Sequence, residues 1–72
     1  MSKDICKLLG ARIRSLRKEK GWRQIDLAQH SGVHEVHISD LERGSREIGL
    51  KTMQKIARAL EVKMAVLLKG LD

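Results

Sequence analysis

The sequence has 72 residues, enough for one small domain and too few for a separate ligand-binding or catalytic domain. Fifteen lysines and arginines against nine acidic residues give a formal net charge of +6, which favours a polyanionic partner such as nucleic acid. Trp22 is the only aromatic residue, since the sequence has no Phe or Tyr. The aromatic surfaces on which proteins that bind single strands or RNA stack the bases are therefore missing, and duplex DNA is the favoured partner.

Apolar residues recur at helical spacing along most of the chain, and no window alternates well enough to predict a strand. The pattern therefore predicts an all-α, compact bundle. We expect five helices, at about residues 4–20, 24–30, 35–43, 50–60 and 62–71. Asp4 is the expected N-cap of the first. Most of the six glycines are read as positions where one helix stops and another begins.

Each predicted helix has its own inward-facing residues. They are Ile5, Leu9, Ile13 and Leu16; Ile25, Leu27 and Ala28; Ile38 and Leu41; and Leu50, Met53, Ile56, Ala57 and Leu60. The last segment, residues 62–71, is apolar on more sides than one core can cover, which predicts contact with a partner chain. A core of this size usually contributes roughly 3–5 kcal/mol of stability, so such a partner would help.

One cysteine, Cys6, excludes an internal disulfide and is typical of a reducing compartment. The sequence shows no signal peptide and no long apolar run, so we expect a soluble, cytoplasmic protein that has no contact with a membrane. Neighbouring Lys3 and Lys7 would lower the pKa of Cys6 and suggest a redox switch, although a half-buried, unreactive thiol is the simpler interpretation. We expect no cofactor, no small-molecule effector and no catalytic site, since no side chains have the spacing of one.

Residues 24–43 meet the requirements of a helix-turn-helix, in which two short helices cross over a tight turn. Ala28 is small where the helices cross, and Gly32 accepts the positive φ that the turn needs. The side chains that should hold the two helices together are all apolar: Leu27, Val33, Ile38 and Leu41. In DNA-binding domains of this kind the second helix enters the major groove.

Together with flanking segments, these residues resemble the Xre family, the Cro-like and phage-repressor-like regulators of bacteria and phages. The matching segments are Gln24-Ile25-Asp26-Leu27-Ala28, Gly32-Val33, Ile38-Ser39, Glu42-Arg43-Gly44 and Ile56-Ala57-Arg58-Ala59-Leu60. The match covers about residues 9–68. Residues 43–50 are similar to those of restriction–modification controller proteins, because apolar Ile48 stands where many family members have proline.

The resemblance implies a single DNA-binding domain over residues 1–72 that forms a homodimer through its last helix and binds a short palindromic operator. It implies an autoregulatory, nucleoid-associated transcriptional regulator that partners with double-stranded DNA and can control a restriction–modification operon. The implied base-reading residues are Glu35, Val36, His37 and Asp40, and the implied phosphate-binding residues are Arg23, Gln24, His34, Ser39, Arg43 and Arg46. The implied dimer contacts are Val62, Met64, Val66, Leu67, Leu68 and Leu71, and Arg17 and Glu42 match a structural ion pair.

Four positions depart from the family pattern. Arg23 and His34 stand where Ser, Thr or Asp usually caps a helix, so we expect two weak N-caps. Glu35 and Asp40 put carboxylates on the reading face, where they repel phosphates and suit only donors such as the cytosine amino group. For Glu35, a favourable position at the positive end of its helix explains the residue equally well.

Three histidines in ten positions, His30, His34 and His37, raise the question of a metal site. The turn at Gly32 should separate the first two and no fourth ligand is near, so we expect no metal. His37 is the expected reader, and its protonation predicts stronger DNA binding in acid. Two other functions stay open: an antitoxin of the same fold, and a protein-interaction module that has lost DNA specificity.

Overall fold

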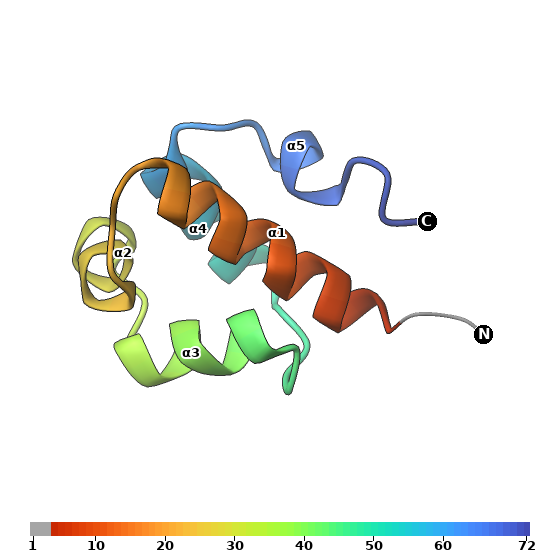
Figure 1. The fold of residues 1–72 in the computed structure, drawn as a ribbon, viewed down its shortest axis with the longest axis horizontal. Coiled ribbons are helices and arrows are strands. Elements are labelled where there is room, and N and C mark those ends of the chain that lie inside the picture. The colour runs from red at the N-terminus through yellow and green to blue at the C-terminus, as the bar shows by residue number, and fades with distance from the viewer. Residues whose placement is uncertain (1–3) are drawn as a thin grey trace.

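The computed structural model describes residues 4–72, which form five helices and no strand (Figure 1). The helices are α1 (Ile5–Glu19), α2 (Gln24–Ser31), α3 (Glu35–Arg43), α4 (Leu50–Leu60) and α5 (Met64–Leu68). The all-α prediction is confirmed, and the first four helices begin and end within one residue of the predicted positions. The fifth is much shorter than expected. Within the described part of the chain, no helix is long and apolar enough to span a membrane.

Helix α1 is the centre of the bundle, and it packs against α3 on one side and α5 on the other (Figure 1). Helix α2 contacts both α3 and α4, so the helix-turn-helix is held to the rest of the fold from two directions. The largest fully buried side chains come from all five helices; they are Ile13, Leu27, Ile38, Ile56 and Leu67. A single apolar core therefore fixes the orientation of α3.

Three expectations about buried residues were wrong. Ile5 and Leu50 were expected in the core but are 54% and 73% exposed. Each is the first residue of its helix, so its side chain lies beyond the end of the core although the helical spacing is right. Leu67 was expected at a dimer contact, but it is completely buried within its own chain, because α5 packs on α1 and α4.

Gly10 lies in the middle of α1, inside the helix that the sequence predicted. A Cβ at this position would stand 2.3 Å from the carbonyl oxygen of Leu41 and 2.6 Å from that of Glu42. Glycine is therefore needed here because the backbones of α1 and α3 approach each other closely. Gly32 has the expected role, since it has a φ of 75° and ends α2 at the turn.

Arg12 connects α1 to the C-terminal end of α5. Its guanidinium donates hydrogen bonds to the carbonyl oxygens of Val66, at 2.5 Å, and Lys69, at 2.8 Å. The last carbonyls of a helix lack partners within the helix, so these bonds stabilise a helix of only five residues. Sequence reasoning missed this role, because both partners of Arg12 lie more than fifty residues further along the chain.

Candidate nucleic-acid interface

The first turn of α3 presents three of the four predicted base-reading residues to solvent. Glu35 is exposed, Val36 is 61% exposed and His37 is half-buried. Two other residues of the same helix, Ile38 and Leu41, are buried in the core. A nine-residue helix that buries one side and exposes short side chains on its first turn has the shape needed to enter a groove of duplex DNA.

Both helices of the helix-turn-helix have better N-terminal caps than the sequence suggested. The backbone N–H of Arg23 donates to the Asp26 carboxylate at 2.8 Å, so the residue three positions into α2 does the capping. At α3, the Nδ1 atom of His34 accepts from the backbone N–H of Val36 at 3.2 Å. The prediction of a weak cap was therefore wrong for His34, whereas the Arg23 side chain forms no capping hydrogen bond, as expected.

Arg23 also favours the ionised form of the Asp26 carboxylate. Its guanidinium lies 3.3 Å from the Asp26 carboxylate and remains 80% exposed. Hydrogen bonds from the Arg23 side chain, and then from its backbone, lower the pKa of Asp26, and partial burial opposes them only weakly. The result is an ionised carboxylate beneath a guanidinium that can still contact a ligand at the start of α2.

Asp40 is not the free carboxylate that the sequence suggested. It accepts a hydrogen bond from Arg43 at 2.5 Å, lies 3.7 Å from Arg46, and has a side chain only 22% exposed. Arg43 also donates to the hydroxyl of Ser39 at 2.9 Å. Asp40 therefore orients two arginines, whose side chains remain 63% and 55% exposed, and its negative charge is balanced by theirs.

Arg17 and Glu42 form the ion pair that the sequence predicted. Two hydrogen bonds, of 2.7 and 2.9 Å, join the guanidinium to both carboxylate oxygens, and both side chains are at least nine-tenths buried. Arg17 also donates to the carbonyl oxygen of Trp22 at 2.7 Å, and the Gln24 amide donates to Glu42 at 3.2 Å. The pair thus connects α1 to α3 and to the first residue of α2.

The three histidines do not converge. His30 stacks on Trp22 with ring centroids 4.2 Å apart and planes 1° from parallel, while His34 caps α3 and His37 lies on its first turn. Among residues 4–72, no three His, Cys, Asp or Glu side chains come close enough together to hold a metal ion. The stack on Trp22 could not be predicted, because it depends on the path of the chain between α1 and α2.

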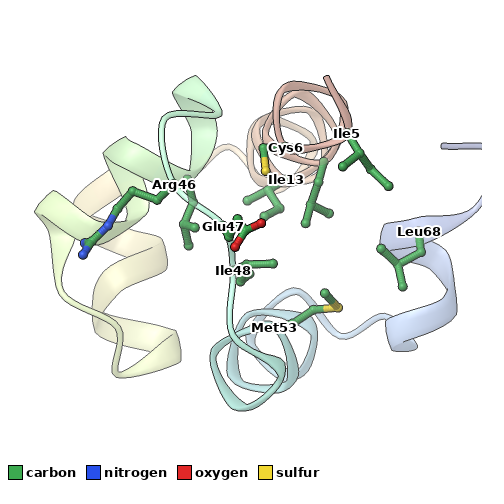
Figure 2. A pocket seen from close by; sticks show the side chains of 10 residues that line it. Ile5, Cys6, Ile13, Arg46, Glu47, Ile48, Met53 and Leu68 are labelled. Atoms are coloured by element: carbon green, nitrogen blue, oxygen red, sulfur yellow. The ribbon is translucent and has the colours of Figure 1, made fainter. Parts of the chain in front are cut away.

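The first turn of α3 is called the reading turn below. Away from it, a second feature is an apolar groove of about 360 Å³ (Figure 2). The groove lies between α1, α4, α5 and the segment that joins α3 to α4. Ile5 of α1 and Leu68 of α5 lie at one end of it, and Ile48 and Met53 line its floor (Figure 2). Cys6 also lines the groove and is half-buried. The groove adds uncovered apolar surface next to α5.

The environment of Cys6 argues against a redox switch and favours the unreactive thiol that was the simpler interpretation of the sequence. Loss of solvent, followed by the charge of Asp4, raises the pKa of Cys6 instead of lowering it. Asp4 caps α1 by accepting from the Cys6 backbone N–H at 2.8 Å, which puts its carboxylate beside the thiol. Lys3, one of the two lysines expected to act on the thiol, lies outside the described residues. The unreactive interpretation is favoured.

Comparisons with known proteins agree with this geometry. A family model described as helix-turn-helix matches residues 13–67. The control protein C.BamHI of Bacillus amyloliquefaciens is 38% identical over 64 residues, which cover 88% of this chain and 79% of that protein.

Two solved structures have the same fold. The restriction–modification controller protein C.AhdI from Aeromonas hydrophila superposes with a TM-score of 0.84 at 35% identity, covering 86% of this chain and 94% of that one. A variant of the controller protein C.Esp1396I, bound to its highest-affinity operator site OM, gives a TM-score of 0.84 at 33% identity, covering 97% and 92%. The chain therefore belongs to the helix-turn-helix family of transcriptional regulators, and its relatives include the controller proteins of restriction–modification systems.

Proposed function

We propose that this protein is a sequence-specific regulator that binds a short palindromic operator in double-stranded DNA as a homodimer. The observation that carries the proposal is the exposed first turn of α3, together with three exposed arginines that Asp26 and Asp40 hold at the start of α2, on α3 and just after α3. The similarity to a controller protein solved on its operator supports the same conclusion. We further propose autoregulation of a restriction–modification operon in the cytoplasm of a bacterium, by analogy with the controller relatives.

The proposed division of roles follows from exposure and partners. Glu35, Val36 and His37 read bases, while Asp40 is reassigned to orienting Arg43 and Arg46. Because both arginines remain more than half exposed, they are available for phosphate oxygens on one side of the groove. The other proposed phosphate contacts are Arg23, Gln24, His34 and Ser39.

The proposed dimer surface differs from the one expected from sequence. Among residues 4–72, the exposed large apolar side chains are Ile5, Val36, Leu50, Val66 and Leu68. Val36 belongs to the reading turn, so the other four require a different explanation. Two of those four, Ile5 and Leu68, line the apolar groove, which a second copy of the chain would cover.

Selection from a pool of randomised DNA duplexes at physiological salt tests the function directly. A dimer that inserts two α3 helices should enrich inverted half-sites about one turn, roughly 34 Å, apart. Replacing His37 with alanine should change the selected sequence, whereas replacing Arg43 with alanine should weaken all sequences alike. If no sequence is enriched, the chain does not act as a sequence-specific regulator, and the protein-interaction alternative would replace it.

Sedimentation of the free protein tests the dimer. A Leu68→Glu substitution should shift the population to monomer, because it puts a charge into the apolar surface next to the groove. Gln54→Glu, which makes the same change in charge at an exposed position of α4, serves as the control. Equal sedimentation of the two variants would contradict the proposed dimer surface.

A further inference from the structure

A polar hollow of about 360 Å³ lies where α1, α2 and α3 meet, separate from the apolar groove. Six residues line it: Arg14 and Arg17 from α1, Gln24 from α2, and Ser39, Glu42 and Arg43 from α3. Three arginines face one carboxylate, so the hollow is suited to an anion. Gln24, Ser39 and Arg43 are already among the proposed phosphate contacts, whereas Arg14 and Glu42 are not.

Most of the charges around this hollow have partners within the protein. Arg17 is bonded to Glu42, and Arg43 to Ser39 and Asp40. Arg14 differs from them, because it is exposed and forms no ion pair within residues 4–72. The hollow therefore contains one guanidinium whose donors are all free for a ligand from outside.

Glu42 holds the Gln24 side chain in one orientation. Its Oε1 atom accepts from Arg17 at 2.9 Å and from the Gln24 amide nitrogen at 3.2 Å, and its side chain is only 3% exposed. An amide nitrogen carries two hydrogens, so one N–H of Gln24 is held by Glu42 and the other remains available to a ligand. Gln24 is also the first residue of α2, where the helix dipole favours an anion.

We propose that this hollow binds one phosphodiester group of the DNA backbone, with Arg14 as a direct ligand and Glu42 as a positioning residue that acts through Gln24. The inference rests on the proposed DNA binding. It extends the contact surface beyond the helix-turn-helix to α1, and it gives the buried Arg17–Glu42 pair a role in binding as well as in stability.

The first test compares Arg14→Ala with Arg58→Ala, which removes the same charge from an exposed position of α4 that does not line the hollow. The probe is a random-sequence duplex, because a phosphate contact is independent of base sequence. Arg14→Ala should weaken binding roughly tenfold at low salt and lower the slope of log K against log salt by about 0.9 per protomer. Arg58→Ala should change affinity by about twofold at most.

The two possible failures are distinguishable. If the wild-type protein binds neither the random duplex nor any selected one, the proposed function is wrong and this inference with it. If the wild-type protein binds but Arg14→Ala behaves like Arg58→Ala, the hollow is not a phosphate site. The proposed DNA-binding function would still stand. Arg14 is exposed, so the comparison does not depend on a variant that fails to fold.

The positioning role is tested by a double-mutant cycle on DNA affinity. Gln24→Ala should weaken binding in the wild-type protein but should have little further effect once Glu42→Leu is present, because no acceptor then orients the amide. A merely structural Glu42 would leave the effect of Gln24→Ala unchanged. Affinity is measured at temperatures well below the unfolding of each variant, and additive effects would overturn this part of the inference.

Discussion

The close approach of α1 and α3 makes Gly10→Ala a decisive substitution. Two physical rules predict opposite signs for the change that it causes in the free energy of unfolding. In a helix interior, alanine is favoured over glycine by about 1 kcal/mol. Here, however, the new Cβ would lie 2.3 Å from the Leu41 carbonyl oxygen, whereas carbon–oxygen contacts are ordinarily about 3.3 Å or longer, so the helices must separate by about 1 Å. Overpacking of this kind costs about 1–3 kcal/mol.

Both blocking atoms belong to the backbone at the end of α3, and no side chain can rotate to make room. We therefore expect the upper end of that range and, after the gain in helix propensity, a net loss of about 2 kcal/mol in the free energy of unfolding. DNA affinity should fall as well, since α3 carries the proposed reading turn.

Urea unfolding followed by circular dichroism, at one fixed protein concentration, measures this difference. Ala11→Gly is the matched control, because Ala11 is the next residue of α1 and is exposed. It should be destabilised by about 1 kcal/mol through helix propensity alone. If Gly10→Ala instead stabilises the protein by a similar amount, the contact between the two backbones is not as close as the structure has it, and the reasoning is refuted.

Three further predictions concern stability. Leu67→Ala should cost about 2–5 kcal/mol because the side chain is fully buried, while Val66→Ala, at an exposed neighbour, should cost about 1 kcal/mol or less; thermal unfolding that gave equal losses would contradict the placement of Leu67 in the core. Arg17→Met should cost about 3–5 kcal/mol because it leaves a buried carboxylate unpaired, and adding Glu42→Leu should restore most of the loss in the same urea assay; a double variant no more stable than the single one would count against this explanation. The lowered pKa of Asp26 means that its contribution to stability is present above the ordinary carboxyl pKa of about 4 and is lost as the pH falls through the folded value. Asp26→Asn should therefore lower the melting temperature at neutral pH and have a progressively smaller effect as the pH is lowered below the ordinary carboxyl pKa, and a difference that does not depend on pH would refute the role of its charge.

Sequence reasoning was most successful where structure depends on neighbouring residues. Apolar spacing located α1 to α4 to within one residue of their ends, since each turn of a helix repeats the same local pattern. The turn at Gly32 was predicted for the same reason, because its positive φ is a property of a single residue. The Arg17–Glu42 pair joins distant residues, and it was expected only from the family resemblance.

Several of the predictions that were wrong concern contacts between segments far apart in the chain. Helical spacing assigns a face to Ile5 and Leu50, but it does not show where along the helix the core ends. Likewise, an apolar α5 was certain to bury surface, but whether Leu67 would pack on its own chain or on a partner depended on how α5 docks against α1 and α4.

The sequence by itself determined the five helices, the helix-turn-helix and the basic surface, because spacing, turn residues and charge are local or additive properties. Only the tertiary structure decided that Gly10 is a contact between backbones and that Arg14 borders a polar hollow. Both depend on atoms brought together from different helices. The distances between such atoms are set by the packing of the whole core, and no local pattern of residues contains them.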